Sequence, residues 1–167
     1  MTIIICTESF DPWQEIQQYQ QLTKTKYGAT SIFIGTMRDF NDGDEVKAMT
    51  LEYYQGMTEK QLEAIIAEAK QQWAVLDVLI VHRVGEILPN QAIVLVSVWT
   101  MHRGDAFDAC RYIMEALKLH APFWKKSCYQ QTKNVGCYTI PTVIILTRLH
   151  SITLDCLVTD VSNLCCV

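Results

Sequence analysis

Two apolar stretches of the chain, residues 75–84 and 92–101, are separated only by a short segment that contains Pro89 and Asn90. A Pro-Asn pair favours a turn, so the two stretches predict neighbouring strands. A connection this short cannot make the crossover that parallel neighbours need, and the two strands are therefore expected to run antiparallel. This hairpin predicts a β-sheet that is largely antiparallel.

Helix and strand signals precede the hairpin. Asp11 followed by Pro12 predicts an N-cap and a first helical residue, for a helix over 12–22. Alternating or β-branched stretches predict further strands at 2–6, 29–37 and 46–54.

Two amphipathic helices flank the hairpin. Thr58 and Gln61 have the spacing of a capping box, and the apolar residues that follow recur with helical spacing as far as Trp73. Asp105 is the predicted N-cap of the last helix, which Pro122 ends. The order of elements predicts an α+β fold with a largely antiparallel sheet and packed helices.

Length and composition bound the class of protein. A chain of 167 residues and 19.1 kDa is typical of one domain. Half of the residues are hydrophobic and 19% are charged, which excludes a disordered chain. The formal net charge is −4, whereas a domain that binds nucleic acid normally has an excess of Lys and Arg. We therefore expect no nucleic-acid partner.

The seven cysteines indicate a reducing compartment. None of them forms a C-x-x-C pair or has the spacing of a zinc site, so neither a metal nor a cofactor is expected. The N-terminal residues lack the features of a secretory signal, and the longest uncharged run, 134–147, is too short for a membrane span. These features predict a cytosolic protein with reduced thiols and no membrane partner.

The chain changes character near residue 126. Residues 127–167 carry four of the 32 charged side chains and five of the seven cysteines. We therefore expect a domain over 1–126 and a divergent, apolar, Cys-rich tail over 127–167.

The sequence has no phosphate-binding glycine loop. We therefore take cations near the ends of predicted elements as the candidate binding residues. His102 and Arg103 stand where a strand gives way to a helix, and free backbone N–H groups there attract anions. Lys118 lies near the end of that helix, with Lys125 and Lys126 shortly beyond it. The alternatives are that His102 and Arg103 are solvated loop residues and that Lys118 complements the helix dipole.

Two further positions have an open interpretation. Arg38 follows the strand at 29–37 and is either a phosphate ligand or half of a surface ion pair with Asp39 or Asp42. His82, within an apolar strand, is interpreted as a buried core histidine rather than as a ligand.

Five linked motifs, in this order and with compatible spacing, resemble the large, catalytic subunit of molybdopterin synthase. They lie at 33–39, at 51–54 with 56–60, at 82–86, at 102–103 with 106–107, and at 113–118 with 121–126. The resemblance covers about residues 28–126, and it implies the α+β domain of that family, sometimes called an α/β hammerhead.

The resemblance also implies a reaction and partners. The family inserts two sulfur atoms into cyclic pyranopterin monophosphate and so makes molybdopterin, a step of molybdenum cofactor biosynthesis. The sulfur arrives as a thiocarboxylate on the Gly-Gly C-terminus of a small ubiquitin-like subunit. Two large subunits pair centrally in a heterotetramer, with one small subunit at each end. Since the partner brings the sulfur, no catalytic cysteine is required.

The family's functional residues can be carried over where the motifs match. Lys118 corresponds to the essential lysine and Lys125 to a second functional lysine. The implied substrate-binding residues are Thr36, Met37, Arg38, His102, Arg103, Lys118, Lys125, Lys126 and Ser127, and the implied apolar wall consists of Phe33 and Met114.

From Ser127 onward the sequence departs from the family pattern, in which a later arginine reaches the neighbouring subunit's site. This departure keeps an alternative open, namely a non-catalytic variant that binds the small subunit or pairs with an intact large subunit. A general phosphate-ester or nucleotide-binding domain is a further alternative of a different class.

Overall fold

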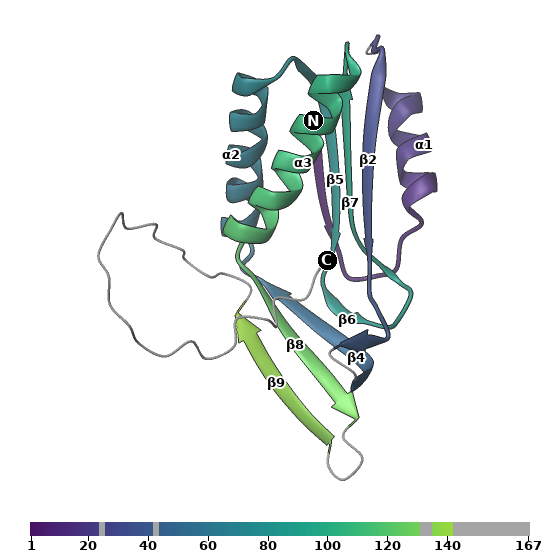
Figure 1. Ribbon diagram of the computed structural model, residues 1–167, viewed down its shortest axis with the longest axis vertical. Coiled ribbons are helices and arrows are strands. Elements are labelled where there is room, and N and C mark those ends of the chain that lie inside the picture. The colour runs from purple at the N-terminus through teal and green to yellow at the C-terminus, as the bar shows by residue number, and fades with distance from the viewer. Residues whose placement is uncertain (24–25, 42–43, 131–134, 142–167) are drawn as a thin grey trace, which may run out of the picture.

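The computed structural model describes residues 1–23, 26–41, 44–130 and 135–141 (Figure 1). The described elements are, in order, β1 (Thr2–Cys6), α1 (Pro12–Leu22), β2 (Ala29–Thr36), β3 (Phe40–Asn41), β4 (Asp44–Tyr53), α2 (Met57–Gln72), β5 (Val75–Arg83), β6 (Gly85–Ile87), β7 (Ala92–Thr100), α3 (Arg103–His120), β8 (Phe123–Gln130) and β9 (Val135–Pro141). The predicted α+β class is confirmed.

The first sheet has the strand order β1-β5-β7-β2. Only β1 and β5 are parallel among its described pairs, and β5, β7 and β2 follow one another antiparallel. The hairpin predicted from the two apolar stretches is therefore confirmed as β5 and β7. The sequence pattern missed the short strand β6 in their connection, which pairs with β4 and thereby joins the hairpin to the second sheet.

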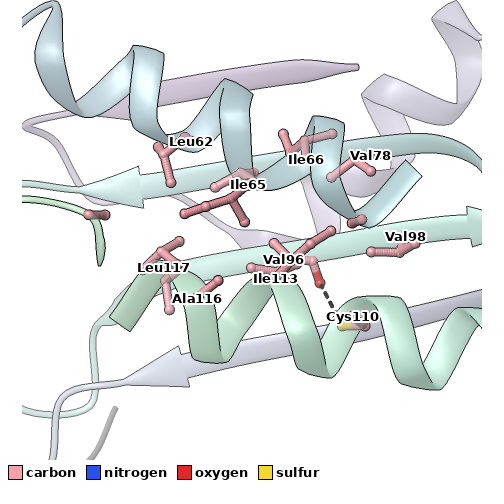
Figure 2. Packing of buried hydrophobic residues seen from close by; sticks show 14 of the residues in the cluster. Leu62, Ile65, Ile66, Val78, Val96, Val98, Cys110, Ile113, Ala116 and Leu117 are labelled. Carbon is pink, nitrogen blue, oxygen red and sulfur yellow. Dashed lines mark hydrogen bonds between the residues drawn. The ribbon is translucent and has the colours of Figure 1, made fainter. Parts of the chain in front are cut away.

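Helices cover both faces of the first sheet. α2 and α3 lie on one face and α1 on the other (Figure 1). Leu62 and Ile66 of α2 pack toward Ile113 and Leu117 of α3, over the valines of β5 and β7 (Figure 2). These four side chains are at most 4% exposed, and each contributes about 1.5–3 kcal/mol by leaving water. The helical spacing of the apolar residues thus creates the layer that fixes α3 against the sheet.

The second sheet begins where α3 ends. Its strand order is β3-β4-β8-β9, and β8 starts three residues after the last residue of α3. The sequence pattern predicted neither β8 nor β9. The expected boundary after residue 126 falls inside β8, and the division of the chain into a domain and a tail stays a prediction.

The N-termini of α1 and α3 test two N-cap residues that were predicted from the sequence. Asp11 caps α1 as predicted, since its carboxylate accepts the backbone N–H of Trp13 at 2.9 Å. The prediction for α3 is wrong: its N-cap is His102 rather than Asp105. The hydroxyl of Thr100 donates to the backbone carbonyl of His102 at 2.7 Å, which turns the chain into the helix one turn earlier. Asp105 instead lies in the first turn, where its charge complements the helix dipole.

The predicted capping box of α2 is also wrong. The helix is preceded by Gly56, whose backbone N–H donates to the carboxylate of Glu59 at 2.6 Å. Thr58 is buried, and its hydroxyl lies 3.5 Å from the carbonyl oxygen of Pro122. Thr58 therefore connects the start of α2 to the segment between α3 and β8, and it does not pair with Gln61.

None of the helices in the described ranges has the length and apolar character that a membrane span requires.

Candidate functional site

A pocket of about 70 Å³ lies where the C-terminal end of α3 meets β8. Lys118 and Lys125 both line it, and both side chains are partly buried. The remaining lining residues are Met49, Leu51, His82, Ile93, Val94, Met114, Leu117 and Phe123. We call this site the lysine pocket. The structure thus brings together two predicted functional lysines from different elements, inside a wall that is otherwise apolar except for His82.

Local structure directs both lysines into the pocket. Lys118 is in the last turn of α3 and lies one helical turn after Met114, on the same side of the helix. On β8, alternate side chains point to the same face, so Lys125 shares a face with the buried Phe123. The β8 strand pairs antiparallel with β4, and the backbone of Lys125 lies opposite that of Leu51.

The predicted substrate contacts at the end of β2 do not line this pocket. Met37 is buried in a cluster that also contains Met49 and Ile93, two residues of the pocket wall. Arg38 follows with an exposed side chain. Thr36 is exposed and lines a separate, shallow hollow of about 400 Å³ beside the start of α1.

The predicted apolar wall is divided between two hollows. Phe33 lines a groove of about 260 Å³ between β2 and α3, together with Phe107 and Arg111. Met114 lines both this groove and the lysine pocket. The two hollows therefore lie on either side of one methionine.

The predicted anion pair lies at the other end of α3. His102 and Arg103 are exposed at the N-terminus of the helix, whereas Lys118 is in its last turn. Lys118 lies fifteen residue steps after Arg103 in the helix, which corresponds to about 22 Å along the helix axis. A single chain therefore does not bring His102 and Arg103 to the lysine pocket.

The last two predicted contacts, Lys126 and Ser127, belong to β8. Their backbones pair with Thr50 and Met49 of β4. Their side chains lie outside the part of the chain that the structure describes, so their contacts with substrate stay predictions.

The sequence interpretation of His82 was incomplete. The residue is 5% exposed, as expected of a core histidine, yet its ring lines the lysine pocket. Its Nδ1 lies 2.9 Å from the backbone carbonyl oxygen of Arg83, and its ring stacks on Phe123 with the centroids 3.9 Å apart. Burial lowers the pKa of His82 from 6.5 to about 4, and the hydrogen bond to Arg83 opposes this shift only in part. The alternation of β5, which turns His82 to the same face as Ile80, was the signal that could have placed it beside α3.

We expect the low pKa of His82 to make the fold less stable in acid. Between pH 6.5 and about 4 the unfolded chain binds a proton at His82 that the folded chain does not bind. The free energy of unfolding therefore decreases by about 3 kcal/mol as the pH falls through this window, and the stability is complete above it. Denaturant unfolding at pH 7 and pH 4 should show that His82→Phe removes most of this dependence.

The matched control is His120→Phe, because His120 is exposed at the end of α3. The lowered pKa of Asp77 stabilises the fold above its ordinary value of 3.8, and this contribution is lost as the pH falls below that value, outside the window. An equal pH dependence in the wild-type chain and in His82→Phe would contradict the prediction.

The chemistry of the pocket is that of an anion site for a small group. Two ammonium donors in an apolar wall can hold a carboxylate or a phosphate, and exclusion of water strengthens these interactions. Within the described ranges, no three His, Cys, Asp or Glu side chains lie close enough together to bind a metal ion.

Comparisons with known proteins agree with this fold. The family model described as MoaE protein matches residues 5–120. A protein of Ralstonia nicotianae named molybdopterin synthase catalytic subunit is 49% identical over 125 residues, which are 75% of this chain and 70% of that protein. The solved MoaE protein from Burkholderia ambifaria is 44% identical with a TM-score of 0.71, and the match covers 86% of this chain and 91% of that one.

A more distant structure shares the fold alone. It comes from a complex of subunits 1 and 2 of the molybdopterin-converting factor of Helicobacter pylori, with 19% identity, a TM-score of 0.66, and coverage of 89% of this chain and 92% of that one.

The fold and the family match define a mixed α+β protein whose relatives are catalytic subunits of molybdenum cofactor biosynthesis. More particularly, the chain belongs to the MoaE family. The resemblance noted in the sequence is therefore confirmed.

Proposed function

We propose that this chain transfers sulfur from the thiocarboxylated Gly-Gly C-terminus of a small ubiquitin-like subunit to cyclic pyranopterin monophosphate, which gives molybdopterin. The observation that carries the proposal is that Lys118 and Lys125 share one apolar pocket in a chain of the MoaE family. The Ralstonia relative is named as a catalytic subunit, which supports an enzyme that works with another subunit.

The two lysines suit the chemistry of this reaction. The thiocarboxylate sulfur bonds to a side-chain carbon of the pterin as a C–O bond of that carbon breaks and its oxygen leaves with the phosphate or as water. A water molecule then cleaves the acyl–sulfur bond, so that the sulfur stays on the pterin as a thiolate and the partner ends as an ordinary carboxylate. Both steps build negative charge near the partner's terminus. A fixed ammonium group that meets this charge stabilises the transition state by about 3–4 kcal/mol. Lys118 acts at the acyl group, and Lys125 binds the adjacent anion.

A homodimer completes the site. The anion pair His102 and Arg103 lies about 22 Å from Lys118 within one chain, so these cations meet only if a second copy supplies one group. A two-fold axis that sets α3 of one copy antiparallel to α3 of the other brings the N-terminus of one helix to the C-terminus of its neighbour.

The outer edge of β2 fits such an axis. β2 is the last strand of its sheet among the described residues, and Ile32 near its middle is 39% exposed. Phe107, 65% exposed, lines the adjacent groove. Antiparallel pairing of two β2 edges places residue 36 of one copy near residue 29 of the other, and residue 29 lies opposite Thr100 at the start of the turn to His102. The apolar groove is then covered in the dimer.

The compartment of the reaction is the cytosol, where the cysteines stay reduced. Cys6 and Cys110 are unpaired in the described part of the chain.

The proposal predicts that the purified chain makes molybdopterin from cyclic pyranopterin monophosphate and the thiocarboxylated small subunit. The product is measured in single-turnover mixtures. Complementation of molybdoenzyme activity in cells that lack the large subunit is the matching cellular assay. A chain that binds the small subunit but yields no product in either assay would instead support the non-catalytic variant.

A further inference from the structure

We infer that His82 is a further binding residue of the lysine pocket: its Nε2 accepts a hydrogen bond from a backbone amide N–H of the small subunit's C-terminal peptide. The inference rests on the proposed function, which makes this peptide the occupant of the pocket. It assigns a recognition role to a buried histidine that the two-lysine chemistry does not use.

The protonation pattern of the ring follows from its hydrogen bond. Nδ1 lies 2.9 Å from the backbone oxygen of Arg83, and a carbonyl oxygen can only accept. Nδ1 therefore carries the proton in the neutral ring, and Nε2 carries the lone pair. Because burial keeps the pKa of His82 at about 4, the ring is neutral and the lone pair is available at pH 7.

The orientation of the ring is fixed from two directions. The bond to Arg83 holds one edge of the ring, and the stack on Phe123, with an angle of 10° between the rings, holds its face. Phe123 shares a face of β8 with Lys125, so the stack also fixes the imidazole relative to that lysine. An acceptor held in this way costs little entropy when a ligand binds.

The polar groups of the pocket complement the end of a peptide. Among the described lining residues, the polar side chains are Lys118, Lys125 and His82, which supply two cationic donors and one neutral acceptor. A C-terminal peptide presents the matching set, an anionic carboxylate or thiocarboxylate and an amide N–H directly before it. A glycine end adds no side chain that would collide with the apolar wall.

A neutral acceptor also has an advantage over a carboxylate at this position. A carboxylate would pair with the lysines and neutralise the charge that must bind the incoming anion. The other two titratable side chains that line the pocket, Lys118 on α3 and Lys125 on β8, are both lysines. The imidazole therefore accepts a hydrogen bond without competing for the lysines.

The test is a double-mutant cycle on binding, with no pterin present. The probes are the small subunit with its ordinary Gly-Gly carboxylate and two semisynthetic forms in which one or the other terminal glycine is N-methylglycine, which lacks the amide N–H. For the wild-type chain, one of the N-methyl forms should bind about tenfold more weakly, because it leaves the imidazole without its donor. For His82→Phe, which keeps a ring against Phe123, that same form should bind no more weakly than the unmodified subunit.

Two amide variants separate recognition from structure. The amide oxygen of Gln can take the place of Nε2, whereas the amide of Asn reaches only the place of Nδ1 and the carbonyl of Arg83. His82→Gln should therefore recover much of the affinity, and His82→Asn should not. If His82→Phe unfolds, the comparison of Gln and Asn, with thermal melting to show equal folding, still decides the question.

Other outcomes have fixed meanings. Additive effects of N-methylation and of His82→Phe overturn the inference, as does an unchanged dissociation constant in all variants. If substitution of His82 raises the KM for the pterin and leaves binding of the small subunit unchanged, the imidazole accepts from a ring N–H of the pterin and not from the peptide. This result overturns the inference. If the chain shows coupling between N-methylation of the small subunit and substitution of His82 and yet makes no molybdopterin, that result supports the role of His82 and overturns only the proposed function.

Discussion

Lys118→Ala is expected to abolish sulfur transfer while the chain stays folded. The ammonium group of Lys118 comes from the last turn of α3 into a pocket whose other described lining residues are apolar except for Lys125 and His82, so few other groups can replace its charge. Loss of one well-placed donor to a developing anion slows a reaction by about 10²–10³-fold, and loss of a group that also takes part in acyl chemistry slows it further. The rate is measured in single turnovers with the thiocarboxylated small subunit and cyclic pyranopterin monophosphate.

The matched control is Lys70→Ala. Lys70 also lies in the last turn of a helix, α2, but its side chain is exposed. Both substitutions remove the interaction of a lysine with a helix C-terminus, which is worth about 0.3–1 kcal/mol, so the two variants should melt alike. Only Lys118→Ala should lose activity. A full rate in Lys118→Ala would remove the lysine from the mechanism, and a loss in both variants would point to stability.

The sequence allowed the first sheet to be predicted because its signals are local. A hairpin connection too short for a crossover and an aspartate before a proline each depend on a few neighbouring residues, and β5, β7 and the cap of α1 were found as expected. The caps of α2 and α3 were not, because a hydrogen bond from Thr100 to His102 starts α3 one turn earlier and a tertiary contact occupies the predicted cap of α2. Thr58, the predicted cap, is buried beside Pro122, 64 residues away in the sequence.

The second sheet could not be derived from such signals. β8 follows α3 after only two residues, and its sequence, Phe-Trp-Lys-Lys-Ser-Cys-Tyr-Gln, lacks the clean alternation of a half-buried strand. Pairing with β4, more than 70 residues earlier for most of its partners, makes it a strand. The lysine pocket depends on that pairing, so the two lysines could be proposed from the sequence but their convergence with His82 could not.

For His102 and Arg103, the sequence contained information on helix length that the prediction of a single anion site did not use. A helix that begins near residue 103 and continues to 120 must hold His102 and Lys118 at opposite ends, since each residue adds 1.5 Å. The residue types indicated one anion site, whereas the length of the helix indicates two half-sites. A second copy of the chain reconciles these indications, and this consequence can be measured.

Mixing two inactive variants should restore activity. Arg103→Ala and Lys118→Ala are each expected to inactivate both sites of a homodimer, one through the N-terminal half-site and the other through the C-terminal one. A mixed dimer has one site with both substitutions and one site with neither, because each site takes Lys118 from one copy and Arg103 from the other. Random association makes about half of the dimers mixed, so about a quarter of the wild-type activity should return.

The control for this experiment is a mixture of Lys118→Ala with Lys125→Ala. These two lysines line the same pocket of the same chain, so every site in every dimer lacks one of them. This mixture should stay inactive however the chains associate. The variants are co-expressed with two different tags, and tandem purification isolates the mixed dimers, in which recovery should rise to about half of the wild-type rate. Recovery in both mixtures, or in neither, would contradict a site shared between two copies in the way that the opposite ends of α3 require.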